Sequence, residues 1–252
     1  MKGERVLLRI DPLKGAGPDL MKELEDGVKR LNFVQMSEPG FFDRLIRGEL
    51  RDGQFHVRLL NRAGDVEALP PAANMEELIG FIRTRLERVY IEKQLARISN
   101  PSPPFRVKIW VTDDRRRDFR IGEKVVFNFS SEKDCYLYLL NVDSQGDFQI
   151  LFPNPLHRGN FVRAGLEKKI PDETAGEMFE FVFREPAGEE MIKAIATLEP
   201  LELEELETEG TQKALSASDI SVVRVKKIEE TLVSREFLWS EDTVVIRSHV
   251  VQ

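Results

Sequence analysis

The sequence predicts an α+β protein in which a small α/β sandwich domain at residues 1–98 precedes an all-β, immunoglobulin-like sandwich at residues 105–252 that has one helix near the C-terminus. Apolar residues recur at helical spacing in two stretches of the first part, whereas short stretches of alternating polarity dominate the second. Residues 99–104 contain three prolines, which is typical of a linker. The charge balance changes at the same place, from net +1 over residues 1–100 to net −8 over the remainder.

The first part alternates strand and helix patterns. A capping signature at Asn74 and Glu77 predicts the start of its second helix, and the sequence Arg51-Asp52-Gly53-Gln54 predicts a hairpin turn. The predicted elements are a strand at 6–10, a helix carrying Leu20, Leu24, Val28 and Leu31, strands at 33–36, 45–50, 55–60 and 66–69, and a helix after residue 74. Such a set buries one face of a small sheet under two helices.

The second part consists mostly of short predicted strands. Residues 135–142 are apolar on both faces and therefore predict a central strand, which the turn at 143–147 joins to the next strand. The predicted strands are 105–111, 124–129, 135–142, 148–152, 168–170, 179–183, 191–198, 222–225 and 243–250, and the predicted helix is 228–236. Six glutamates in residues 199–210 predict an exposed, mobile loop.

A succession of motifs in the second part resembles a known family. The motifs include Asp134-Cys135-Tyr136-Leu137-Tyr138-Leu139-Leu140-Asn141-Val142-Asp143, Leu151-Phe152-Pro153-Asn154-Pro155 and Pro186-Ala187-Gly188-Glu189. Together with the tryptophan at 239, they resemble the DUF4384 domain, a domain of unknown function, over residues 105–250. The resemblance implies an accessory module of the kind found C-terminal to bacterial caspase-like peptidase domains, and it implies no catalytic residues.

Composition and missing motifs exclude several classes of function. The chain has one cysteine and three widely spaced histidines, which excludes a disulfide framework and predicts no metal centre. No phosphate-binding glycine loop, GxSxG or HExxH motif occurs, so we expect no cofactor and no enzyme, at most the non-catalytic part of a caspase-like peptidase. An enzyme would require carboxylates from distant strands to converge.

The expected environment is cytoplasmic. No apolar run is long enough to span a membrane, and the first residues lack the apolar segment of a secretory signal. A periplasmic or envelope-associated location is the alternative if an upstream signal was removed. The triple arginine at 115–117 lies among aspartates in an acidic domain, so we expect no nucleic-acid partner.

Two segments that could be functional sites, a possible cysteine nucleophile and a possible calcium loop, are better explained as structural features. Cys135 begins an apolar strand, which predicts a buried thiol and not a nucleophile. Residues 141–147 resemble half of a calcium loop, but Phe152 occupies the position of the bidentate glutamate, so an ordinary hairpin turn is favoured.

The predicted function is a non-catalytic accessory or regulatory protein-interaction module. Its partner is an unidentified protein, for which the resemblance implies a caspase-like peptidase domain. The predicted contact residues form a proline-stiffened loop after a strand, namely Phe152, Pro153, Asn154, Pro155, His157, Arg158 and Asn160. The alternative is a sensor that binds a small molecule or an envelope glycan in a cleft lined by Tyr136, Tyr138 and Phe152.

Overall fold

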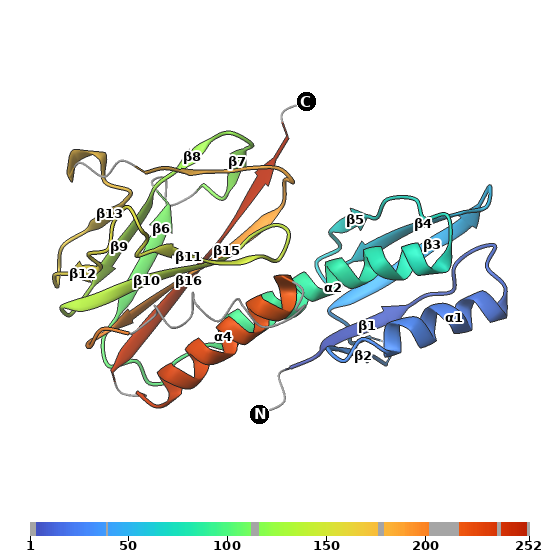
Figure 1. Cartoon of the computed structure of the whole chain (residues 1–252), viewed down its shortest axis with the longest axis horizontal. Coiled ribbons are helices and arrows are strands. Elements are labelled where there is room, and N and C mark those ends of the chain that lie inside the picture. Colours follow the sequence, from blue (N-terminus) through green and yellow to red (C-terminus); the bar gives the residue numbers. More distant parts are fainter. Residues whose placement is uncertain are drawn as a thin grey trace. The chain divides into compact units, whose positions relative to one another are not determined.

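The chain divides into two compact units, Met1–Tyr90 and Ile91–Gln252. A computed structural model describes residues 4–38, 40–111, 116–175, 179–201, 217–235 and 238–250. The units are drawn in Figure 1, one as a sheet with two helices and the other as a β-rich sandwich. This agrees with the predicted α+β class and with the predicted helix near the C-terminus.

The first unit is a five-stranded sheet with the strand order β2-β1-β3-β4-β5. Strand β1 runs parallel to both of its neighbours, and β3, β4 and β5 follow as an antiparallel meander. The elements are β1 (Val6–Ile10), α1 (Pro18–Lys29), β2 (Val34–Met36), β3 (Arg44–Arg51), β4 (Gln54–Leu60), β5 (Val66–Ala68) and the first part of α2 (Met75–Arg97).

Helices α1 and α2 contribute to the core of the first unit together with one face of the sheet. Val6 and Leu8 alternate along β1 into this core and meet Leu24 of α1, all three with no exposed surface. The two helices come close at Gly27, where an added Cβ atom would lie 2.2 Å from Cδ1 of Ile79. A larger residue at position 27 would therefore push the helices apart.

Two local predictions in this unit are confirmed. The turn between β3 and β4 places Asp52 and Gly53 at φ angles of 53° and 76°, the left-handed pair that a two-residue hairpin requires. At the start of α2 the backbone N–H of Glu77 donates to Oδ1 of Asn74 (2.9 Å), and Oε2 of Glu77 accepts from the N–H of Ala73 (2.7 Å). The first bond satisfies a donor that the first helical turn leaves unpaired, and the second attaches the residue before the N-cap to that turn.

The second unit is built around a six-stranded sheet with the order β11-β10-β15-β16-β7, in which β12 also pairs with β10. A three-stranded sheet (β13-β9-β6) and a two-stranded sheet (β14-β8) complete the unit. The strands are β6 (Val107–Val111), β7 (Asp118–Arg120), β8 (Lys124–Val125), β9 (Phe127–Ser131), β10 (Cys135–Val142), β11 (Phe148–Phe152), β12 (Phe161–Val162), β13 (Lys168–Ile170), β14 (Phe181–Val182), β15 (Glu189–Thr197) and β16 (Trp239–His249), with a short 3₁₀ turn at Glu173–Ala175 and helix α4 at Ala217–Val233.

Both faces of the six-stranded sheet are buried. Leu137 and Leu139 of β10 belong to a core shared with Phe129 of the three-stranded sheet. Tyr138 and Leu140 point to the opposite side and belong to a second core. Helix α4 and the end of α2 supply the other part of that second core, through Ile91, Leu95, Val225, Ile228 and Leu232. The prediction of a central strand that is apolar on both faces is confirmed.

The predicted strand at 222–225 is wrong, because these residues lie inside α4. Val225 is fully buried against the sheet whereas Val223 is 49% exposed. The valines therefore follow a helical face, and packing against the sheet outweighs their preference for strands. The helix begins at residue 217 and not at 228. Of the predicted acidic loop at 199–210, residues 202–210 lie outside the described residues.

The division between the two units falls within α2, between Tyr90 and Ile91. Residues 99–104, predicted as a linker, follow the end of this helix and belong to the second unit. Asn100 is 7% exposed, and its Nδ2 donates to the carbonyl oxygen of Trp239 (2.6 Å). That the two parts separate at residues 99–104 stays a prediction.

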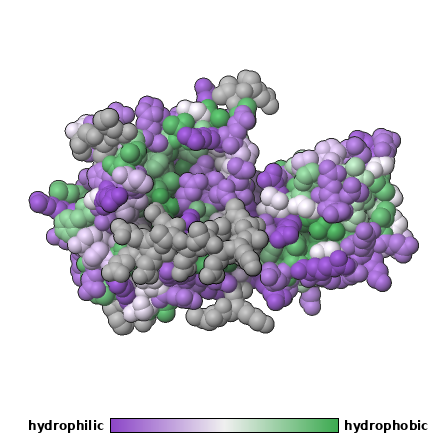
Figure 2. Space-filling view, in the orientation of Figure 1, coloured by the Kyte–Doolittle hydropathy of each residue, from purple (hydrophilic) through white to green (hydrophobic). Residues whose placement is uncertain are grey.

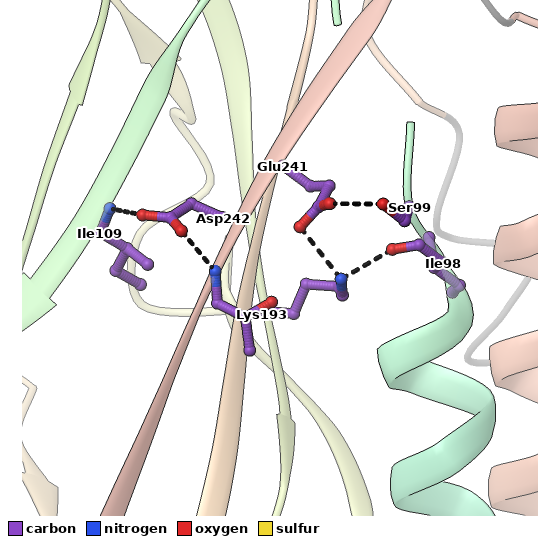
Figure 3. A network of polar contacts seen from close by, with 7 residues as sticks. Ile98, Ser99, Ile109, Lys193, Glu241 and Asp242 are labelled. Atoms are coloured by element: carbon purple, nitrogen blue, oxygen red, sulfur yellow. Dashed lines mark hydrogen bonds and ion pairs between the residues drawn. The ribbon is translucent and has the colours of Figure 1, made fainter. Parts of the chain in front are cut away.

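A buried lysine joins the end of α2 to the six-stranded sheet (Figure 3). Lys193 is only 2% exposed. Its Nζ donates to the carbonyl oxygen of Ile98 (2.6 Å) and lies 3.1 Å from Oε2 of Glu241. Oε1 of Glu241 accepts from the hydroxyl of Ser99 (3.0 Å). Burial lowers the pKa of Lys193, and the Glu241 carboxylate acts in the opposite direction.

The described surface carries scattered apolar side chains among charged ones. Figure 2 shows hydrophobic side chains gathered over part of the visible face of the second unit, with hydrophilic side chains around them. Within the described ranges, no helix has the length and apolar character needed to cross a membrane.

We predict that Lys193→Ala lowers the free energy of unfolding by about 3 kcal/mol, because it leaves a mostly buried carboxylate without its cation. Lys193→Met keeps the aliphatic stem and should cost less. Chemical denaturation of the two variants measures the difference. Equal losses would show that the aliphatic stem of Lys193 does not contribute, because both variants lack the charge.

The lowered pKa of Lys193 predicts that the free energy of unfolding depends on pH. The unfolded chain binds more protons than the folded chain between the lowered pKa of Lys193 and its ordinary value of 10.5. The free energy of unfolding should therefore gain a rising contribution with pH in that window, and Lys193→Met should remove this contribution. Denaturation curves at several alkaline pH values test this, and identical slopes in both proteins would contradict it.

Candidate functional site

The loop between β11 and β12 contains six of the seven predicted contact residues and is organised by Asn154. Oδ1 of Asn154 accepts hydrogen bonds from the backbone N–H groups of Leu156 and His157, both at 2.9 Å. Its Nδ2 donates to the carbonyl oxygen of Leu151 (3.1 Å). The backbones of Asn154 and His157 also exchange two hydrogen bonds of 3.0 Å. An asparagine that bonds its own following backbone is a common way to close a tight turn.

Both ends of this loop are attached to the sandwich. Phe152 is fully buried in the core, and its ring centroid lies 5.3 Å from that of His157. Nδ2 of Asn160 donates to the carbonyl oxygen of Leu137 (3.1 Å), and the carbonyl oxygen of Asn160 accepts from the backbone N–H of Leu137 (2.8 Å). Phe152, Asn154 and Asn160 therefore hold the loop in place, and the Phe152 side chain is not available to a partner.

The exposed part of the loop is small. Pro155 and Arg158 are exposed, whereas Pro153 and His157 are half-buried. Leu156 is 74% exposed, more than the other large apolar side chains with described exposure, and sequence reasoning did not select it. The available signal was an apolar residue placed directly after Pro-Asn-Pro, where the strand cannot continue.

Cys135 lies in the core of the sandwich, where it has no exposed surface. It begins β10 and pairs with Val162 of β12. Burial raises the pKa of its thiol, against a smaller opposing effect of a hydrogen bond with Ser131. A neutral, inaccessible thiol is a poor nucleophile.

The segment 141–147 forms a hairpin turn, as predicted. Oδ1 of Asp143 accepts from the N–H groups of Gln145 (2.8 Å) and Asp147 (2.9 Å). The N–H of Asp143 donates to the carbonyl oxygen of Asp147 (3.1 Å), which closes the turn between β10 and β11. Among the described residues, no group of three or more histidine, cysteine, aspartate or glutamate side chains is placed to hold a metal ion.

The three aromatic residues proposed for a ligand cleft do not meet. Phe152 packs in the core on one face of the six-stranded sheet. Tyr138 belongs to the core on the other face, with Tyr136 packed against it. No single cleft can therefore be lined by all three.

The arginine cluster is described from residue 116 onward. Nη2 of Arg116 lies 2.6 Å from Oε2 of Glu123, and its guanidinium stands 4.5 Å from the ring centroid of Phe119. This hydrogen bond lowers the pKa of Glu123. Arg116 thus interacts within the domain. Arg115 and the aspartates at 113 and 114 lie outside the described residues.

Residues 118–200, from β7 to three residues after β15, match a family model. This segment is a DUF4384 domain, a domain of unknown function. The resemblance predicted from the sequence is confirmed for these residues, and the DUF4384 segment contains the whole loop between β11 and β12. A search of curated proteins finds no match.

One solved structure with some similarity is the Pseudomonas fluorescens alkylpurine DNA glycosylase AlkC bound to DNA containing an abasic site analog. The match covers 49% of this chain and 37% of that chain, at 12% sequence identity and a TM-score of 0.24. A similarity at this level carries no argument about the fold or function of the DUF4384 domain.

We predict that Cys135→Ser lowers the free energy of unfolding by roughly 1 to 3 kcal/mol, because a hydroxyl replaces a thiol in an apolar core. A thiol reagent should label the native wild type only as fast as the domain opens. Mass spectrometry after timed labelling measures this rate, with the denatured chain as control. Rapid labelling of the native protein would contradict the buried position.

Proposed function

We propose that the chain is a non-catalytic accessory or regulatory module that binds a protein partner through the loop at residues 153–160. One observation carries the proposal. Leu156 is 74% exposed at the tip of a loop whose backbone is fixed by the side chain of Asn154. Binding residues are found disproportionately on loops that a rigid scaffold positions, and an exposed leucine on such a loop supplies an apolar contact.

The rigidity of the loop favours binding. Four hydrogen bonds made by Asn154 and Asn160 side chains restrict the loop before any partner arrives. Ordering a flexible loop opposes association, and a loop that is already ordered avoids most of that entropy loss. The exposed residues Pro155, Leu156 and Arg158 are therefore presented in one conformation.

The exposed side chains suggest the chemistry of the partner. Leu156 fits an apolar pocket, and the neighbouring Arg158 fits a carboxylate at the rim of that pocket. The family resemblance suggests a caspase-like peptidase domain as this partner. The buried, protonated thiol of Cys135 is consistent with a non-catalytic role for the chain itself.

We predict that Leu156→Asp and Arg158→Glu each weaken partner binding by about tenfold or more, because they remove the apolar and the charged contact. The partner is first identified by a photo-crosslinking amino acid placed at position 156 in the native host. Calorimetry with the purified partner then gives the affinities, and thermal unfolding should be nearly unchanged because both side chains are exposed.

Val66→Asp is the matched control, since Val66 is an aliphatic residue of the first unit that is 54% exposed. It should not change the affinity. If a crosslinker at position 66 captures the same proteins as one at position 156, or if the loop variants bind as tightly as the wild type, the loop is not the binding site.

A further inference from the structure

A pocket of about 470 Å³ lies in the second unit, at the end of the β10–β11 hairpin opposite to the loop at 153–160. Its floor is a row of register partners across three adjacent strands, Gln149 on β11, Asn141 on β10 and Ile192 on β15. The hairpin turn and the segment after β14 form its sides. Ser144 joins these two sides through a hydrogen bond from its hydroxyl to the carbonyl oxygen of Pro186 (2.6 Å).

Asn141 has an unmet hydrogen bond in this pocket. The residue is 5% exposed, and its Oδ1 is buried without a hydrogen-bond partner. Its Nδ2 donates to Oε2 of Glu190 (3.2 Å), which fixes the orientation of the amide because a carboxylate can only accept. A buried acceptor without a donor is costly, so this oxygen favours a ligand that brings an N–H group.

The charge at the pocket is mostly negative. Five carboxylate residues line it, namely Asp143, Asp147, Glu180, Glu185 and Glu190, against the single cation of Arg184. Partial desolvation raises the pKa of Asp147, and the nearby Asp143 carboxylate adds to the effect. Glu180 is already paired with Lys124, and the remaining excess of carboxylates indicates a negative potential that a cation would relieve.

An aromatic wall faces this polar floor. Phe181 is half-buried and lines the pocket with its ring centroid 5.6 Å from that of Phe127, and both Phe127 and Phe183 are buried core residues at this wall. Aromatic faces attract organic cations and also cover the aliphatic part of a ligand.

We propose that this pocket binds a guanidinium or primary ammonium group carried on an aliphatic stem. The nitrogen donors would satisfy Oδ1 of Asn141, the carboxylates would balance the charge, and the half-buried Phe181 would cover the stem. The group belongs either to a free amine or to an arginine or lysine side chain of a peptide. This proposal does not depend on the loop at 153–160, which lies at the other end of the hairpin.

The test is an NMR titration of the full chain with four probes. Agmatine represents a free cation and N-acetyl-arginine amide represents a peptide side chain. N-acetyl-citrulline amide has nearly the same shape without the charge, and calcium chloride tests a metal. We expect saturable shifts at the pocket with both guanidinium probes, with a Kd on the order of 1 mM, and at least tenfold weaker binding of the citrulline probe. The tighter of the two guanidinium probes identifies the source of the group.

Three variants test the assigned residues. Asn141→Leu removes the acceptor, Glu190→Gln removes its charged neighbour, and Asp147→Asn removes an exposed carboxylate at the rim without threatening the fold. The first two should weaken guanidinium binding by about tenfold, and Asp147→Asn by a few-fold. Glu189→Gln is the matched control, because Glu189 precedes Glu190 on β15, is absent from the pocket lining and pairs with Arg247.

The proposal is overturned if neither guanidinium probe gives saturable shifts, if the citrulline probe binds equally well, or if calcium alone produces the same shifts at lower concentration. Equal weakening by Glu189→Gln and Glu190→Gln would also overturn it. If Asn141→Leu does not fold, the comparison of Glu190→Gln with Glu189→Gln decides the question.

Discussion

The six-stranded sheet of the second unit is apolar on both faces, and most other features of this unit follow from that constraint. A sheet of this kind must be covered on each side, since every uncovered leucine or isoleucine would lose roughly 1.5 to 3 kcal/mol of stabilisation. The three-stranded and two-stranded sheets cover one face. Helix α4 and the last residues of α2 cover the other, so the second unit begins at Ile91. Lys193 and Asn100 fix the same segment by hydrogen bonds.

The central strands also position the two candidate sites. Strands β10 and β11 form one hairpin, with the loop at 153–160 at one end and the acidic pocket at the other. β10 lies inside the sheet, where it pairs with β15 from Tyr136 to Val142, whereas β11, which leads into the loop and contributes Gln149 to the pocket, is an edge strand. Asn154 orders the loop through its side-chain hydrogen bonds, and Asn141 forms part of the pocket floor with an unpaired side-chain oxygen. The same pair of strands thus positions two asparagines with different roles.

Much of this fold could be predicted from patterns over short distances. A run that is apolar on both faces identified β10, the turn after it located β11, and the capping pair at Asn74 and Glu77 located the start of α2. Residues 222–225 were predicted as a strand because β-branched residues favour strands. The prediction was wrong because this segment packs one helical side against the sheet as part of α4. The loop was found from its prolines. The pocket was not, because its residues come from β8, β9, β10, β11, β14, β15 and β16, and no short pattern links segments so far apart in the sequence.

The need for cover on both faces is tested most directly by comparing two fragments, 91–252 and 105–252. The first keeps the buried residues Ile91, Leu95 and Ile98, whose carbonyl oxygen accepts from Lys193, and the second lacks them. We expect fragment 91–252 to unfold cooperatively, and fragment 105–252 to melt at a much lower temperature and to bind a dye specific for exposed apolar surface. Equal melting temperatures with no dye binding would contradict the account, because the sheet would then be stable with one face partly uncovered.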